Sequence, residues 1–138
     1  MPLFDAPKRV GFTGTQIGMT QSQRKELEEK LKVLKAEGYI WCHHGNCIGA
    51  DEQAAMIAKR LGFKLHAHPC NIKKKQSNIW SDVTENEKLP LTRNKDIVDR
   101  CTIMFAAPKS REEELRSGTW ATVRHARKVE RDLKILLP

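Results

Sequence analysis

Short apolar runs recur along the chain at the spacing of strands in an alternating α/β domain. The runs at 9–14, 39–42 and 63–68 are bounded by glycine, proline or polar residues, which is typical of strands. The run at 101–108 is almost wholly apolar, as expected for a central strand covered on both faces. A last apolar stretch at 133–136 predicts an edge strand.

Helical patterns fill the intervals between these strands. A capping box at Thr20 and Gln23 predicts the start of a helix in which three leucines at i, i+4 and i+7 form the apolar stripe. Further helices are predicted at 50–61, 94–100 and 117–129. Strands alternating with helices over short connections pair in parallel through right-handed crossovers. We therefore predict an α/β, Rossmann-like, doubly wound and mostly parallel sheet of about five strands, with helices on both faces.

Length and composition are those of one globular domain. With 138 residues, 39% hydrophobic and 30% charged, residues 1–138 are expected to form a single domain. The polar, lysine-rich segment 70–90 is predicted to be an exposed loop or a lid. No apolar run is long enough to cross a bilayer, and the N-terminus lacks the pattern of a signal peptide. We expect a cytoplasmic protein with no membrane partner.

The chain is basic, with 25 Lys and Arg against 17 Asp and Glu and a net charge of +8. This excess is compatible with attraction either to nucleic acid or to the phosphates of a nucleotide. Few aromatic residues accompany the basic clusters, so the stacking platforms of single-strand binders are not evident. Charge alone does not choose between the two kinds of partner.

Cysteine and histidine residues gather at the ends of two predicted strands that could be neighbours. Nitrogen and sulfur ligands from both could converge on zinc. Neighbouring strand residues alternate between faces, however, so packing in the core is the favoured interpretation, and we expect reduced thiols, no metal and no cofactor. The six residues concerned are Cys42, His43, His44, His66, His68 and Cys70.

Glycine turns mark the junctions where predicted strands lead into predicted helices, which is where an α/β domain binds ligands. The first turn is not a dinucleotide fingerprint, because the second strand ends in His43 and His44 rather than in an acidic residue. A P-loop motif is also absent from the sequence. Glycine nevertheless lets backbone N–H groups approach an anion at a helix N-terminus, so phosphate binding is expected.

Each turn also has a purely structural interpretation. The two glycines in Gly45-Asn46-Cys47-Ile48-Gly49-Ala50-Asp51 could simply form a tight turn, while Asp51 could either stabilise the helix start or bind a ligand hydroxyl. In Ser117-Gly118-Thr119-Trp120, N-capping by the serine competes with phosphate binding. Arg93, beside Asn94, could reach a phosphate or form a surface salt bridge.

The order of these segments resembles that of the SLOG superfamily of Rossmann-like nucleotide-binding domains. Gly-x-Thr-Gly-Thr is followed by His-Gly-Asn-x-x-Gly-Ala-Asp, Pro-Leu-x-Arg-Asn, an apolar strand ending in Ala-Pro, and Ser-Gly-Thr-Trp. The resemblance covers about residues 8–127. The superfamily includes the phosphoribohydrolases and the DNA-processing (DprA) proteins. It implies binding of a nucleotide or nucleotide-derived phosphorylated ligand by a small stand-alone sensor or carrier, and a homodimer or larger homo-oligomer. The implied ligand-binding residues are Thr13, Gly14, Thr15, His44, Gly45, Gly49, Ala50, Asp51, Arg93, Asn94, Ser117, Gly118, Thr119 and Trp120.

One departure from the family pattern bears on catalysis. The phosphoribohydrolase signature P-G-G-x-G-T-x-x-E ends in a glutamate that acts on the ribosyl group, and here Thr122 stands at that position. N-glycosidic hydrolysis of a nucleoside monophosphate would then need another carboxylate, for which Asp51 is the candidate. Whether the chain is an enzyme is left open, with hydrolysis as one alternative to simple binding and single-stranded DNA binding of the DprA type as another.

Overall fold

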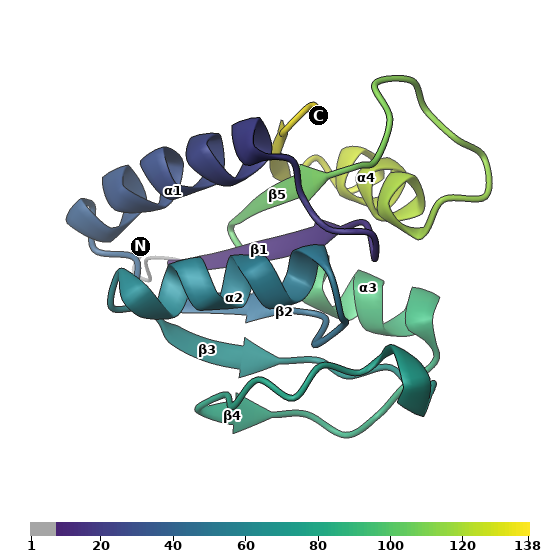
Figure 1. The fold of residues 1–138 in the computed structure, drawn as a ribbon, viewed down its shortest axis with the longest axis horizontal. Helices are drawn as coiled ribbons and strands as arrows, with labels where there is room; N and C mark the ends of the chain where they lie inside the picture. The colour runs from purple at the N-terminus through teal and green to yellow at the C-terminus, as the bar shows by residue number, and fades with distance from the viewer. Residues whose placement is uncertain (1–7) are drawn as a thin grey trace.

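A computed structural model describes residues 8–138, which form six strands, four α-helices and one short 3-10 turn (Figure 1). Residues 1–7, on which the signal-peptide prediction rests, lie outside the described part. The strands are β1 (Arg9–Gly14), β2 (Trp41–His44), β3 (Lys64–Ala67), β4 (Val83–Thr84), β5 (Ile103–Ala107) and β6 (Asp132–Ile135). The helices are α1 (Gln21–Ala36), α2 (Ala50–Arg60), α3 (Pro90–Arg100) and α4 (Gly118–Lys128), and the 3-10 turn η1 is Lys73–Lys75.

The six strands form one parallel sheet in the order β4-β3-β2-β1-β5-β6. The chain winds outward from β1 through β2 and β3 to β4, and then returns to place β5 on the other side of β1. The order of strands therefore reverses between β1 and β5, and ligands of open α/β sheets bind in the crevice at the carboxyl ends of the strands at such a point.

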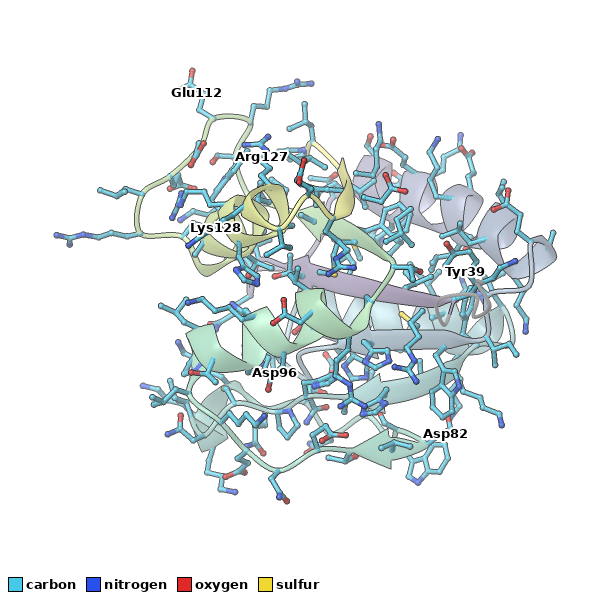
Figure 2. All side chains as sticks on the ribbon, turned by 180° about the vertical axis from the view of Figure 1, so that it is seen from behind. Tyr39, Asp82, Asp96, Glu112, Arg127 and Lys128 are labelled. Carbon is cyan, nitrogen blue, oxygen red and sulfur yellow. The ribbon has the colours of Figure 1, made fainter. Side chains whose placement is uncertain are left out.

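Helices cover both faces of the sheet. On one face, α1 and α2 pack their apolar stripes on Phe12 and Phe105. On the other face, α3 and α4 contact Met104 and Ala106, the neighbours of Phe105 along β5. Figure 2 shows this second face, with Asp96 on α3 and Lys128 on α4. The alternation of side chains along β5 confirms the predicted doubly wound arrangement.

Two features of the sheet differ from the prediction. A sixth strand, β4, was not predicted, because it has only two residues and both are exposed. The apolar run predicted to be the central strand is β5, which lies second from the β6 edge, while β1 lies between β2 and β5. Burial on both faces identifies an inner strand, but it does not say which inner strand is in the middle.

The segment 70–90, predicted as a loop or lid, contains η1, β4 and the first residue of α3. Its β4 extends the sheet beyond β3, and its Trp80 is exposed beneath the Lys59 ammonium. The four cysteines form no disulfides within residues 8–138. None of the helices among these residues has the length and apolar character needed to cross a membrane.

Candidate functional site

A pocket of about 850 Å³ opens at the carboxyl ends of β1 and β5. The loops after β1, β2 and β5 and the start of α4 lie at this end of the sheet (Figure 1). In Figure 2, Glu112 of the loop after β5 and Tyr39 before β2 lie at opposite ends of the sheet. The volume is within the range of roughly 300–1,000 Å³ that small-molecule sites occupy. The pocket thus lies where the strand order reverses.

Most of the residues expected to bind the ligand line this pocket. Four do not, and they are His44, Gly49, Ala50 and Trp120. The ten that do are Thr13, Gly14, Thr15, Gly45, Asp51, Arg93, Asn94, Ser117, Gly118 and Thr119.

Gly49 and Ala50 hold the loop after β1 rather than facing the pocket. Gly49 has a φ of +87°, and a Cβ added to it would lie 2.2 Å from the carbonyl oxygen of Gln16. The N–H of Ala50 donates to the carbonyl of Thr15 over 2.9 Å. Only glycine fits at position 49, and the role of this turn is to set the position of the loop after β1.

His44 and Trp120, two of the residues expected to bind the ligand, are buried and do not line the pocket. The Nδ1 of His44 accepts a hydrogen bond from the backbone N–H of Asn46, two residues later in the chain. The Nε2 of His44 lies 3.1 Å from the hydroxyl of Ser81. Trp120 packs against Ala106 in the core between α4 and the sheet. Burial lowers the pKa of His44 to about 4, which leaves the imidazole neutral at physiological pH.

Arg93 and Asn94 sit in the first turns of α3, which begins at Pro90, four residues before the predicted start. The Nε of Arg93 donates to the Asn94 side-chain oxygen over 2.7 Å, and Nη1 donates to the carbonyls of Gly45 and His68. The guanidinium therefore joins the ends of β2 and β3 to α3. It forms part of the pocket wall with most of its donors already used by the protein.

Asp51 is a buried carboxylate in the wall of the same pocket. Its Oδ2 accepts from the N–H of Cys47 over 3.3 Å, while Oδ1 has no hydrogen-bond partner among residues 8–138. Burial raises the pKa of Asp51 to about 6, against the opposing effect of the nearby Arg93 charge. This unpartnered oxygen is itself buried, so a ligand hydroxyl would reach it only if the pocket wall moved.

The start of α4 presents backbone donors to the pocket. Ser117 caps the helix, because its hydroxyl accepts from the N–H of Trp120 over 3.2 Å. The N–H groups of Gly118 and Thr119 belong to the first turn, where intrahelical acceptors are lacking. A Cβ added to Gly118 would meet nothing within 4 Å, so this residue borders open space. Thr122 is buried outside the pocket and donates its hydroxyl to the Gly118 carbonyl, which leaves no carboxylate at the signature position.

Several pocket residues were missed by the sequence motifs. Basic side chains come from η1, which lies in the segment predicted to be an exposed loop or a lid, and from the loop after β5. Apolar side chains from three separate segments also line the pocket, and they are exposed. The basic residues are Lys75, Lys109 and Arg116, and the exposed apolar residues are Ile17, Leu91 and Leu115. Exposed apolar residues are common singly, so only their arrangement around the pocket distinguishes them.

A cluster of histidines that could bind a metal ion lies on the sheet outside the pocket. His43, His66 and His68 are buried and each offers a ligand atom within 4.8 Å of the others. Burial lowers the pKa of His43 to about 2 and that of His68 to about 3, so both are neutral at physiological pH. Cys42, His44 and Cys70, also considered as zinc ligands, are not part of this cluster.

No protein-family model and no curated protein sequence matches the chain. Among solved structures, the molybdenum cofactor binding protein of Rippkaea orientalis has a TM-score of 0.73 at 19% identity, covering 95% of this chain and 77% of that one. The molybdenum cofactor carrier protein of Chlamydomonas reinhardtii has a TM-score of 0.69 at 16% identity, with coverages of 95% and 78%.

A third neighbour is DNA processing protein A of Helicobacter pylori, with a TM-score of 0.63 at 16% identity. The alignment covers 94% of this chain and 65% of that protein. At these identities the likeness concerns the fold. The chain shares the Rossmann-like α/β fold of these proteins, DNA processing protein A included, and this is the fold that its sequence predicted.

Proposed function

We propose that the pocket binds a nucleotide or a nucleotide-derived phosphorylated ligand, and that the chain acts as a sensor or carrier of that ligand. The observation that carries the proposal is the convergence of two glycine turns, Thr13-Gly14-Thr15 and Ser117-Gly118-Thr119, on one pocket. Both supply hydroxyl side chains where the strand order reverses, and the turn at the start of α4 also supplies backbone N–H groups, whereas the Thr15 N–H donates to the Ala107 carbonyl over 3.1 Å. Such sites favour phosphate because N–H groups and the positive end of a helix face it together.

The remaining lining residues are assigned by their chemistry. Asp51 would accept a ribose hydroxyl at its unpartnered Oδ1 once a small movement of the pocket wall exposes this buried oxygen. Lys75, Lys109 and Arg116 give the pocket an excess of positive charge, since the acidic lining residues are Asp51 and Glu114. The exposed Ile17, Leu91 and Leu115 would contact the heterocycle in place of His44 and Trp120.

The fold neighbours support binding without naming the ligand. Two of them bind or carry molybdenum cofactor, and the third is described in a single-stranded DNA binding mode. A basic pocket could receive phosphates from either kind of partner. A mononucleotide-sized ligand is favoured because the space is a pocket of about 850 Å³ with a buried carboxylate in its wall.

Hydrolysis of the N-glycosidic bond is the second candidate, and it is favoured by Asp51. A buried carboxylate with a pKa near 6 suits a group that stabilises a developing ribosyl cation or activates water. In this reaction the bond between base and ribose breaks, water adds to the ribosyl carbon, and the base leaves with a proton. Asp51 would have to act without the glutamate that Thr122 replaces.

The test is calorimetric titration with nucleoside monophosphates, ADP-ribose and cyclic nucleotides, using Gly118→Glu as the diagnostic variant. The new side chain enters open space, and its charge suits a helix start, so the fold is retained while a phosphate is repelled. We expect affinity to fall at least about tenfold, a loss of about 1.4 kcal/mol. Gln21→Glu places the same charge at the first residue of α1 and serves as the matched control.

The same samples separate the alternatives. Unchanged affinity in Gly118→Glu would refute binding at this pocket. Release of free base, seen by chromatography and abolished in Asp51→Asn, would establish the hydrolase. Binding of oligonucleotides but not mononucleotides, with affinity falling steeply as salt rises, would establish the DNA-binding function instead.

A further inference from the structure

Three histidines are brought together on the face of the sheet opposite α1 and α2. His43 on β2 and His66 on β3 are paired in register, and His68 follows two residues later, on the same side as His66. Their neighbours Cys42 and Leu65 point to the other face and join the core beneath α2. The parallel register therefore builds the cluster from residues that are far apart in sequence.

The three rings form a close stack with few other polar contacts. Ring centroids are 4.3 Å apart for His43 and His66, 5.0 Å for His43 and His68, and 4.8 Å for His66 and His68. His43 Nδ1 lies 2.8 Å from His68 Nε2, and His66 Nε2 lies 2.6 Å from the Glu85 carboxylate. His43 Nε2 is buried with no hydrogen-bond partner in the described part of the chain. Burying an imidazole nitrogen without a hydrogen-bond partner costs free energy, and a group bound at this nitrogen would remove that cost.

We propose that His43, His66 and His68 form a binding site for a divalent transition metal ion of the zinc class. Three imidazoles are a common ligand set for such an ion, and a water or a carboxylate completes the tetrahedron. Zinc–nitrogen bonds of about 2.0–2.1 Å place ligand nitrogens roughly 3.4 Å apart. The ligand atoms here lie within 4.8 Å of one another, but the rings are stacked with interplanar angles of 10–27°. Metal binding would therefore require the imidazoles to turn about their side-chain bonds until their nitrogens converge.

Glu85 has the position of a supporting residue for such a site. Metal-bound histidines usually donate their other ring N–H to a carboxylate, which orients the ring. If His66 binds metal through Nδ1, its Nε2–H donates to Glu85, as the 2.6 Å contact already allows. Glu85 also pairs with Arg100 over 3.2 Å, which offsets one positive charge near the cluster. We therefore treat Glu85 as a positioning residue.

A metal ion here would join β2 and β3 and, through Glu85, the chain just after β4. The carbonyl of His68 also accepts a hydrogen bond from Arg93, which lines the ligand pocket. The site is nevertheless separate from that pocket, because none of the three histidines lines it. The proposal therefore stands or falls independently of the proposed function.

The experiment uses the full chain without an affinity tag, freed of metal by a chelator and titrated with Co²⁺ in the absence of nucleotide. We expect one equivalent to bind with the visible absorption of a tetrahedral nitrogen and oxygen site, and Zn²⁺ to displace it. Zn²⁺ should also raise the midpoint of thermal unfolding. No saturable cobalt spectrum would overturn the proposal, as would an intense near-ultraviolet thiolate band, which would place the ion on the cysteines.

Variants assign the site to these residues. His68→Gln should abolish the cobalt spectrum, while His125→Gln, which removes a histidine paired with Asp99 outside the cluster, should leave it unchanged. Glu85→Gln keeps all three ligands and should weaken affinity roughly 10- to 100-fold. Because the Glu85 side chain is about one-third exposed, this variant stays informative if His68→Gln does not fold. Full cobalt affinity in His68→Gln, or in Glu85→Gln where His68→Gln does not fold, would overturn the proposal.

Discussion

Replacing Asp51 by asparagine should make the protein more stable at neutral pH while removing an acceptor from the pocket. Asp51 is only 5% exposed, and its Oδ1 has no partner within residues 8–138. Burial raises its pKa from 3.8 to about 6 in the folded state. Above pH 6 the folded protein must therefore hold a buried charge that the unfolded chain exposes to water.

The sign of the effect follows from this difference. An acid whose pKa is higher in the folded state contributes most to stability below its unfolded pKa, and this contribution is lost as pH rises through the folded pKa. A pKa difference of about 2 corresponds to about 3 kcal/mol, lost between pH 4 and pH 6. Asparagine is neutral throughout but leaves a buried amide nitrogen without a partner, which costs about 1–3 kcal/mol, so we expect a net gain of up to about 2 kcal/mol at pH 8.

The assay is urea unfolding of both proteins at intervals from pH 4 to pH 8. Histidines and other carboxylates titrate in both, so only the difference between the two unfolding free energies is interpreted. This difference should be small at pH 4, grow in favour of Asp51→Asn up to about pH 6, and then stay level. Asp132→Asn, at an exposed position on β6, controls for the loss of one negative charge. A difference independent of pH, or a less stable Asp51→Asn at pH 8, would show that burial does not raise the pKa of Asp51 in the folded state.

Three further substitutions test the framework of the pocket by urea unfolding. Arg93→Met removes the donor from three buried acceptors and should cost about 3–5 kcal/mol, and a loss below about 1 kcal/mol would contradict its role in joining β2, β3 and α3. Gly49→Ala would place a Cβ 2.2 Å from the Gln16 carbonyl at a residue whose φ is +87°, so it should lower stability by at least about 2 kcal/mol and weaken ligand binding. Unchanged stability would show that the loop after β1 can move to accommodate the new side chain. Gln23→Leu breaks the capping box and two 2.8 Å bonds to backbone carbonyls, for an expected loss of about 2–4 kcal/mol, whereas exposed Gln21→Leu should change stability by less than about 0.5 kcal/mol.

The fold followed from local signals where those signals were strong. The strand at 9–14 and the capping box at Thr20 and Gln23 are in the structure as predicted, because both depend on adjacent residues. The start of α3 was placed four residues late, since no side chain caps this helix and Pro90 alone marks its first turn. The two-residue β4 carries no apolar pattern, and it exists only because β3 offers it an edge to pair with.

The candidate site was predictable at the level of loops but not of every side chain. The parallel topology brings the turns after β1, β2 and β5 to one edge whatever their exact residues. Which way His44 or Trp120 points depends on packing against other elements, and both turned into the core. Similarly, Arg93 binds carbonyls of Gly45 and His68, which are distant in sequence and come together only through the sheet.

The histidine cluster also could not be predicted fully from the sequence. The sequence placed histidines at the ends of two strands but did not say which of them share a face. His43 and His66 meet because β2 and β3 pair in one particular register, and a shift by one residue would separate them. Neighbouring His44 points elsewhere for the same reason.

Phosphate binding at the carboxyl ends of β1 and β5 can be tested directly by a nuclear magnetic resonance titration of the ¹⁵N-labelled protein with pyrophosphate and an equimolar mixture of the four common nucleoside monophosphates. We expect saturable shifts of the amide signals of Gly14, Gly118 and Thr119, with little change along the outer face of α1. If the signals at these three positions do not move, or if the shifts are confined to surfaces away from the carboxyl ends of β1 and β5, the ligand does not bind at this pocket.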